Sequence, residues 1–390
     1  MRVAIAHDYL NQMGGAEKVV EVLHDMFPSA PIFTSIYVPT AVSRALQEAD
    51  IRPSFMQKLP LIRKFARYYL GAYPYAFELF DFSGYDMVLS SSSAFAKGVI
   101  TAPDTCHICY CHTPMRFAWN YYAYIERERL SAPVRLILPY IVHRVRRWDE
   151  ITANRVDHYV ANSHEVERRI RKHYRRSATV IYPPVETRNF RVTEEDEGYF
   201  VMISRLLAYK RVDIAIEAAN KLRVGLKVIG TGRDEKRLRK LAGPTIEFLG
   251  RLPAQDVVDC LQRSHALIFP GREDFGIVPV EAMACGKPVI AYGRGGVLDT
   301  VMDGVTGTFF EEQTPDRLAE AMRSFRPADF DPYTIRRHAE AFDSSVFRRK
   351  MRDFVEEKYD QHRAQYRPPE PAKLTEGLAP VEYAAEPKPV

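Results

Sequence analysis

The sequence predicts an α/β protein built from two Rossmann-like domains that face a central cleft. Short apolar segments of strand length alternate with segments of helix length in both halves of the chain, which is the pattern of parallel sheets. Each half also has its own glycine-containing loops after strands. With 390 residues, the chain is longer than one ordinary hydrophobic core supports, so two domains are expected.

Proline and charge patterns place the domain boundaries. Pro183 and Pro184 break a short strand, and the charged stretch 194–198 that follows is typical of an exposed linker. The end of the chain holds many Pro, Glu and Ala residues and little that forms a core, so we expect it to be disordered. These features predict a first domain, a linker, a second domain, a charged helix and a disordered tail at 1–182, 183–197, 198–343, 344–366 and 367–390.

Composition excludes several classes of protein. A net charge of +5 is too small an excess to indicate a nucleic-acid partner, and no run of about 18 apolar residues is present to span a membrane. Five cysteines, an odd number, favour a reducing compartment. The segment from Met1 to Ala6 is a strand rather than a signal peptide. We therefore expect a cytoplasmic location, with the inner face of the cell membrane as an alternative.

The most informative segment runs from the strand 266–269 into a following helix. Proline and glycine residues stop the strand, and Gly276 opens the helix. Glu273 therefore lies at the carboxyl end of a strand, where open α/β sheets bind ligands, and Glu281 lies in the helix. A helix N-terminus attracts anions. Two acids beside such a terminus suit a ligand that has both hydroxyl groups and phosphate.

This segment resembles a known enzyme family. Glu273 and Glu281, with seven residues between them, resemble the E-x7-E motif of the retaining family-4 glycosyltransferases, and residues 275–289 are also similar to that family. The resemblance covers about residues 1–365. It implies the GT-B fold, with a C-terminal helix that crosses back to the first domain. It also implies a retaining, metal-independent hexosyltransferase whose nucleotide-sugar donor is a substrate, so that no cofactor is expected.

The resemblance implies roles for individual residues. Glu273 would bind hydroxyls of the donor sugar, and Glu281 would bind the nucleotide ribose. Arg205 and Lys210 are similar to the family's R-x4-K element. Two fixed cations there would stabilise the charge that develops on the departing diphosphate. The other residues implied at the donor site are Gly14, Gly15, Phe275, Gly276, Ile277, Val278, Gly295 and Gly296.

His112 lies at the end of a predicted strand, where the family carries a histidine at the acceptor cleft. We expect it to bond a donor-sugar hydroxyl or to orient the acceptor, with a structural role in the following turn as the alternative. The strand before it contains other metal-ligating residue types, Cys106, His107, Cys109 and Cys111. Side chains of a strand alternate between two faces, so four tetrahedral ligands do not converge easily there, and we expect no metal site.

One residue departs from the pattern of this family, and one short segment matches the motif of a different enzyme class. Asp299 stands where the family usually has a glutamate, which leaves its role open. Asp329 and Asp331 match the D-x-D motif of metal-dependent transferases. They lie in a proline-flanked connector after the last αβ unit, so we do not expect them to bind metal.

Residues 58–70 are predicted to form a basic amphipathic helix. Apolar side chains fall on one face at helical spacing, and Arg63, Lys64 and Arg67 fall on the opposite face. This pattern indicates peripheral contact with a membrane surface or, equally, a helix that packs on the sheet. A similar basic run at 135–148 supports the membrane interpretation.

The segments 7–10 and 111–117 look like bacterial mannosyltransferases of surface polysaccharides. We therefore expect transfer of a hexose, with mannose from GDP-mannose as the favoured donor, to a lipid-linked or saccharide acceptor in polysaccharide synthesis. An NAD dehydrogenase is disfavoured because no complete G-x-G-x-x-G follows a strand. A nucleotide-sugar 2-epimerase of the same fold and a non-catalytic module that binds sugar nucleotides or membranes remain as alternatives.

Overall fold

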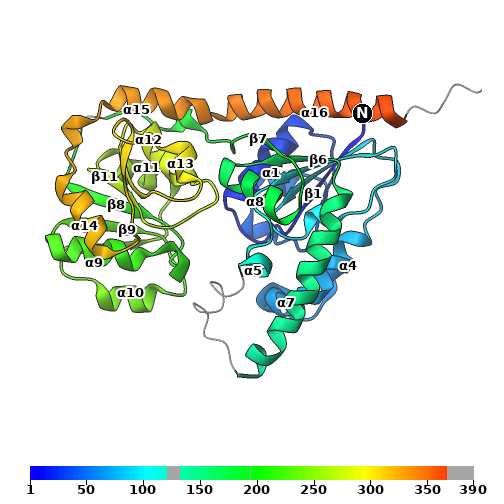
Figure 1. The fold of residues 1–390 in the computed structure, drawn as a ribbon, viewed down its shortest axis with the longest axis horizontal. Helices are drawn as coiled ribbons and strands as arrows, with labels where there is room; N and C mark the ends of the chain where they lie inside the picture. Colours follow the sequence, from blue (N-terminus) through cyan, green and yellow to red (C-terminus); the bar gives the residue numbers. More distant parts are fainter. Residues whose placement is uncertain (121–131, 194, 367–390) are drawn as a thin grey trace, which may run out of the picture.

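The computed structural model describes residues 1–120, 132–193 and 195–366. The side chains outside this description are those of Arg63, Lys64, Arg67, Tyr68 and residues 132–135. The described chain forms two parallel sheets with hydrophobic cores and helices against them (Figure 1), which confirms the predicted pair of Rossmann-like domains. The tail 367–390, predicted to be disordered, lies outside the described residues.

The first sheet contains seven described strands in the order β3-β2-β1-β4-β5-β6-β7. Their bounds are Val3–His7 (β1), Ile32–Thr34 (β2), Ile51–Pro53 (β3), Met87–Ser92 (β4), Cys106–Cys111 (β5), His158–Ala161 (β6) and Thr179–Val180 (β7). The strand order reverses between β1 and β4, so the crevice for a ligand is expected at their carboxyl ends. The helices of this domain are α1 (Gly15–Met26), α2 (Arg44–Glu48), α3 (Ile62–Phe65), α4 (Tyr73–Glu78), α5 (Arg116–Trp119), α7 (Ala132–Thr152) and α8 (His164–His173).

The second sheet contains six described strands in the order β10-β9-β8-β11-β12-β13. Their bounds are Tyr199–Ile203 (β8), Gly225–Ile229 (β9), Ile246–Gly250 (β10), Ala266–Phe269 (β11), Val289–Tyr292 (β12) and Gly307–Phe310 (β13). Here the strand order reverses between β8 and β11. The helices are α9 (Val212–Leu222), α10 (Glu235–Leu241), α11 (Ala254–Gln262), α12 (Ile277–Ala284), α13 (Val297–Thr300), α14 (Pro315–Ser324) and α15 (Pro332–Ala339).

The last helix, α16 (Ser344–Tyr366), runs from the second domain along the first (Figure 1). Its side chains Phe347, Met351 and Phe354 are buried in the same core as Ile5 of β1. The predicted return of a C-terminal helix to the first domain is therefore confirmed. The linker predicted at 183–197 falls between β7 and β8.

The prediction of a single helix over 58–70 is wrong. Leu61 has a φ of 51°, which lies outside helical geometry, and the helix α3 that follows is only four residues long. Three-ten turns then cover Ala66–Ala72. Ile62 is buried in a core of the first domain, as the alternative of packing on the sheet requires. The basic side chains of this stretch lie outside the described residues, and no helix within the described part is long and apolar enough to cross a bilayer.

Candidate functional site

The predicted site residues lie in loops at the carboxyl ends of strands of both sheets and in the helices that follow those loops. β8 leads into Arg205 and Lys210, β11 leads into Glu273, and β12 leads into Gly295. In the first domain, β1 leads into the loop that ends at Gly14, the residue that caps α1. Because the ligand crevice of a parallel sheet lies at these ends, the fold directs all of these loops toward the cleft.

The glycine loop of the first domain reaches the second domain. A Cβ atom added at Gly15 would lie 2.7 Å from Cδ1 of Ile277, the first residue of α12. Nζ of Lys18, one turn further along α1, lies 3.2 Å from Oε1 of Glu281. A larger side chain at position 15 would force the end of the Ile277 side chain to move, so glycine there lets the two domains approach closely without that rearrangement.

Lys210 and Glu273 form an ion pair in the cleft. The side chains are 13% and 21% exposed, so the pair is accessible but partly shielded from water. The glycine pair after β12 holds the loop of Glu273: Gly296 N–H donates to the Glu273 carbonyl over 2.9 Å. Gly295 has a φ of 86°, and a Cβ there would lie 2.5 Å from the same carbonyl. The N–H of Gly296, a residue that the resemblance implies at the donor site, is thus engaged in holding the backbone of Glu273.

Arg205 and Lys210 both contact Tyr209, and the hydrogen bonds of Arg205 to the described residues are long. Its Nη1 donates to Oε1 of Gln12 in the first domain, and its Nη2 donates to Oη of Tyr209, both over 3.5 Å. Hydrogen bonds of that length are weak. An exposed guanidinium with weak neutral partners can exchange them for an anionic oxygen, which binds it more strongly.

His112 lies directly after β5 and is almost buried. Its Nε2 lies 2.8 Å from Oγ of Ser91 on β4. Burial, and after it the neighbouring His7, lowers the pKa of His112 to about 4. The imidazole is therefore neutral near pH 7, so it can form hydrogen bonds but carries no charge.

Two family matches together span most of the chain. Residues 13–189 match the family described as "Glycosyltransferase Family 4", and residues 185–326 match "Glycosyl transferases group 1". The chain belongs to the family-4 glycosyltransferases. The resemblance inferred from Glu273 and Glu281 is thereby confirmed. The protein is a retaining, metal-independent hexosyltransferase, and its nucleotide-sugar donor is a substrate rather than a cofactor.

Two relatives show how far the sequence similarity of this glycosyltransferase extends. An uncharacterized glycosyltransferase of Methanocaldococcus jannaschii, MJ1178, is 26% identical over 70% of this chain and 75% of its own. A GDP-mannose-dependent monoacylated alpha-(1-6)-phosphatidylinositol monomannoside mannosyltransferase of Corynebacterium glutamicum is 37% identical, but over only 30% of this chain and 35% of its own. The similarity to the mannosyltransferase thus covers a limited part of the chain.

Solved structures confirm the GT-B fold. Sucrose-phosphate synthase of Thermosynechococcus elongatus superposes with a TM-score of 0.73 at 16% identity, covering 93% of this chain and all of that one. Anabaena Alr3699/HepE in complex with UDP superposes with a TM-score of 0.69 at 16% identity, covering 92% of this chain and all of that one.

The glycosyltransferase holds its domains together with charges that the sequence did not reveal. Asp274, next to Glu273, forms ion pairs with Arg116 and Arg169 of the first domain. Nη2 of Arg272 lies 2.7 Å from Oε1 of Glu165 in α8. Burial alone would raise the pKa of Glu165, but hydrogen bonds and charges of the surrounding arginines lower it to about 2. These partners lie more than 100 residues apart, so no local pattern signals them.

Asp8 organises the loop after β4. Its carboxylate accepts the backbone N–H groups of residues 93–96 over 2.6–3.0 Å, and the hydroxyl of Ser93 over 2.9 Å. Sequence reasoning gave Asp8 no role. The signal that could have indicated one is its position as an acid directly after the first strand, at the ligand-binding edge of the sheet.

Asp299, whose role the sequence left open, and Asp331 of the D-x-D motif both bind the N-terminal end of a helix. The carboxylate of Asp299 accepts the N–H of His164 over 2.8 Å and faces its Nδ1 over 3.0 Å, so it caps α8 from the other domain. The carboxylate of Asp331 accepts the N–H groups of Tyr333 and Thr334 at the start of α15. The carboxylate of Asp331 is therefore occupied by hydrogen bonds to the start of α15, which gives the D-x-D motif a structural explanation.

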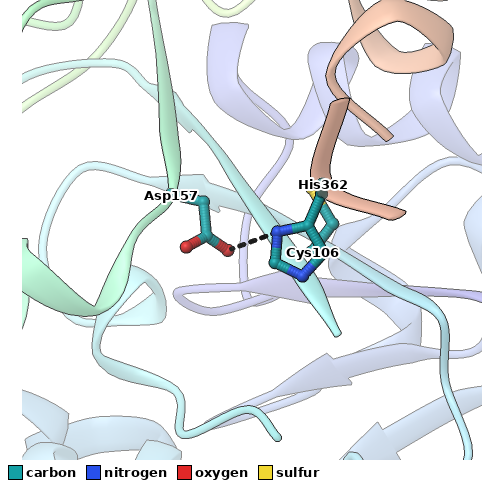
Figure 2. Close-up of side chains that lie close together, drawn as sticks. All are labelled: Cys106, Asp157 and His362. Atoms are coloured by element: carbon teal, nitrogen blue, oxygen red, sulfur yellow. Dashed lines mark ion pairs between the residues drawn. The ribbon is translucent and has the colours of Figure 1, made fainter. Parts of the chain in front are cut away.

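The cysteines of β5 separate as the strand alternation predicts: Cys106 belongs to one core, and Cys109 and Cys111 belong to another. Figure 2 shows Cys106 close to Asp157 and to His362 of α16, whose Nδ1 lies 3.9 Å from Asp157 Oδ2. Burial raises the pKa of Cys106 to about 12, so the thiol is protonated at neutral pH. This group lies at the amino end of β5, opposite the cleft, where α16 meets the first domain.

Proposed function

We propose that this glycosyltransferase moves mannose from GDP-mannose to a lipid-linked or saccharide acceptor in bacterial polysaccharide synthesis. The observation that carries the proposal is the ion pair of Lys210 and Glu273, together with Arg205, which contacts the same Tyr209 as Lys210 and also faces Gln12 of the glycine loop. The choice of mannose is supported by relatives whose names describe GDP-mannose-dependent mannosyltransferases, in Corynebacterium glutamicum and Mycolicibacterium smegmatis. HepE, which is similar in fold, was solved with UDP, so a UDP-sugar is the donor to compare first.

The pair supplies the two kinds of group that a sugar diphosphate requires. When the donor binds, Lys210 exchanges Glu273 for the diphosphate, and Glu273 accepts hydrogen bonds from sugar hydroxyls. Arg205 joins Lys210 at the diphosphate. As the bond between sugar and phosphate breaks, negative charge grows on the leaving oxygen, so the two cations stabilise the transition state more than the ground state. Glu281 takes the ribose hydroxyls in place of Lys18.

A donor screen and two variants test the proposal. GDP-mannose is expected to raise Tm more than UDP-, ADP- or TDP-sugars, and to support transfer to a lipid-linked or oligosaccharide acceptor. Glu273→Gln and Lys210→Ala should remove transfer while Tm changes by only a few degrees, because the pair is partly exposed. Lys221→Ala, which removes an exposed ion pair with Asp316, is the control. Variants with full turnover would end the assignment.

The same assay separates the alternatives. Conversion of the sugar nucleotide to its 2-epimer without an acceptor would identify an epimerase of this fold. Tight binding without turnover across the acceptor panel would identify a non-catalytic module. Transfer from a UDP-sugar in preference to GDP-mannose would retain the reaction type and overturn the choice of donor.

We also propose that the enzyme docks on anionic membranes through the start of α7. Figure 1 shows this helix projecting away from the first sheet. Its large apolar side chains Leu136, Ile137 and Tyr140 are 82%, 56% and 60% exposed. The segment 132–148 carries four arginines and no acidic residue, and the guanidinium of Arg144 lies 5.0 Å from the ring centre of Tyr140. An apolar tip with basic residues behind it complements an anionic lipid surface.

Flotation with vesicles tests where this contact lies. Leu136→Ser with Ile137→Ser, or Arg144→Gln with Arg147→Gln, should reduce binding to phosphatidylglycerol vesicles several-fold. Leu241→Ser on the second domain, also exposed, is the matched control. Neutralising Arg63, Lys64 and Arg67 tests the surface first predicted at 58–70. Loss of vesicle binding only in that triple variant would show that the membrane contact lies at 58–70 rather than on α7. Unchanged binding in all variants would exclude both surfaces.

A further inference from the structure

A buried polar chain links His112 to the glycine loop. Nε2 of His112 lies 2.8 Å from Oγ of Ser91, and the same oxygen lies 3.1 Å from Nδ1 of His7. On the other side of the His7 ring, Nε2 lies 4.0 Å from Oε1 of Glu17. Glu17 and His7 are each only 2% exposed. Four groups, from the residue after β5 and from β4, β1 and α1, therefore share one polar path under the cleft.

The protons on His7 follow from its partners. Its Nδ1 also lies 3.0 Å from the carbonyl oxygen of Ser91, and a carbonyl oxygen only accepts, so Nδ1 carries a proton. Nε2 is buried, has no hydrogen-bond partner in the part of the chain that the structure describes, and faces the carboxylate of Glu17. Two acceptors facing each other in a buried space are unfavourable. A second proton on Nε2 removes this conflict and makes His7 an imidazolium beside a carboxylate.

Glu17 connects this charge to the donor side of the cleft. Its Oε2 accepts the N–H of Gly14 over 2.9 Å, and its Oε1 accepts Nε2 of Gln12 over 3.2 Å. Oε1 of Gln12 in turn faces Nη1 of Arg205. Burial alone would raise the pKa of Glu17, but the hydrogen bond and charge of His7 lower it, which supports an ionised carboxylate. One carboxylate thus fixes both the glycine loop and the amide that faces Arg205.

The same chain favours one tautomer of His112. Ser91 Oγ receives the proton of His7 Nδ1, so its own proton is free to be donated to Nε2 of His112. The neutral imidazole of His112 then holds its single proton on Nδ1. It offers a donor, not a base, to a ligand. The other charged or titratable groups within electrostatic reach of His7, Glu17 and His112 include Asp8, Tyr9, Arg205 and Asp274.

We propose that His7 and Glu17 form a charged positioning pair that shapes the glycine loop and makes His112 a hydrogen-bond donor through Nδ1. Neither residue needs to touch the substrate. The inference rests on the proposed sugar transfer for its kinetic test alone, because the protonation states can be measured without any substrate.

Nitrogen NMR of the histidine side chains is the first test. Near neutral pH, His7 is expected to be doubly protonated and His112 to be neutral with its proton on Nδ1, with His7→Asn and His112→Asn used to assign the signals. In Glu17→Gln, which keeps the shape and the acceptor for Gly14, His7 should become neutral while Tm stays within a few degrees. A neutral His7 in the unchanged protein, or a His112 proton on Nε2, would overturn the proposal even if transfer is confirmed.

Kinetics of paired variants at His112 give the second test. The amide nitrogen of asparagine can replace a donor at the Nδ1 position, whereas the glutamine amide reaches the Nε2 position. His112→Asn should therefore retain at least tenfold more kcat than His112→Gln, with similar KM for the donor. The reverse order would contradict donation from Nδ1. If no variant and no unchanged protein transfers sugar, the proposed function fails, and the NMR result still decides the proton assignment.

Discussion

Two lysine–carboxylate pairs of this enzyme have the same chemistry in different surroundings. Lys97 and Asp149 lie inside the first domain, with side chains 1% and 0% exposed. Lys210 and Glu273 lie in the cleft, at 13% and 21%. Asp149 also accepts the indole N–H of Trp119 over 2.7 Å and the hydroxyl of Tyr174 over 2.9 Å. Among the described residues, the Glu273 carboxylate receives a hydrogen bond from Lys210 alone.

The difference separates a pair that is fixed in the fold from a pair that can exchange a partner for a ligand. A buried pair whose remaining bonding positions are filled by protein groups cannot change partners without leaving a buried group unpaired. A partly exposed pair with open bonding positions can exchange its partner for a ligand at low cost. By this criterion Lys97 and Asp149 fasten α7 to the loop after β4, whereas Lys210 and Glu273 have the open bonding positions that the proposed donor site requires.

The largest effect is expected from breaking the buried pair. Lys97→Met leaves the carboxylate of Asp149 buried without its cation, and should lower the free energy of unfolding by about 3–5 kcal/mol in urea titrations. Adding Asp149→Asn removes the stranded charge and keeps an acceptor for the indole of Trp119, so the double variant should regain part of the loss. A double variant no more stable than Lys97→Met would show that charge pairing is not the cause.

Exchanging the charges of the cleft pair should change activity instead. Lys210→Glu combined with Glu273→Lys retains an ion pair, so the free energy of unfolding should stay within about 1 kcal/mol of its original value. Transfer should nevertheless fall by about 10²–10³-fold, the usual loss when a group that stabilises the transition state is removed. Steady-state assays check the expected loss of transfer, and urea unfolding of the same preparations checks the expected stability. Restored turnover in the exchanged variant would mean that the pair serves structure alone.

Two buried histidines should make the stability of the fold depend on pH. Burial lowers the pKa of His107, and likewise of His112, to about 4 from an ordinary value of 6.5. Between these values the unfolded chain binds protons that the folded chain does not, so stability is full above pH 6.5 and falls as pH drops toward 4. Each histidine contributes a slope of up to about 1.4 kcal/mol per pH unit. His107→Gln should flatten the curve measured by urea unfolding, and His143→Gln, at an exposed position, should not.

The sequence predicted what local chemistry determines. The strand 266–269, the helix opened by Gly276 and the acids at Glu273 and Glu281 follow from residues within one strand–loop–helix unit, and the structure has the unit as expected. The polarity of α/β sheets then placed Arg205 on the same edge. None of this needs information from distant parts of the chain.

The interactions that escaped prediction depend on distant partners. Lys97 is an unremarkable lysine in sequence and becomes structural only because Asp149 arrives from α7. Asp274 pairs with Arg116 and Arg169 only once the domains meet. The helix predicted over 58–70 failed for a different reason: hydrophobic spacing does not report the backbone of Leu61, which leaves helical geometry.

The smallest effect is expected at a pair that resembles neither of the first two. Asp299 is 12% exposed, but its partner His164 is 54% exposed, and the contact caps α8 across the domain boundary. Losing such a cap costs about 0.5–2 kcal/mol. Asp299→Ala should therefore lower the free energy of unfolding by about 1 kcal/mol and change kcat/KM less than threefold, with Asp299→Asn close to the unchanged protein. If Asp299→Ala reduced transfer a hundredfold without loss of stability, Asp299 would belong with Glu273, because only a carboxylate that changes partners during the reaction affects the rate so strongly and the fold so little.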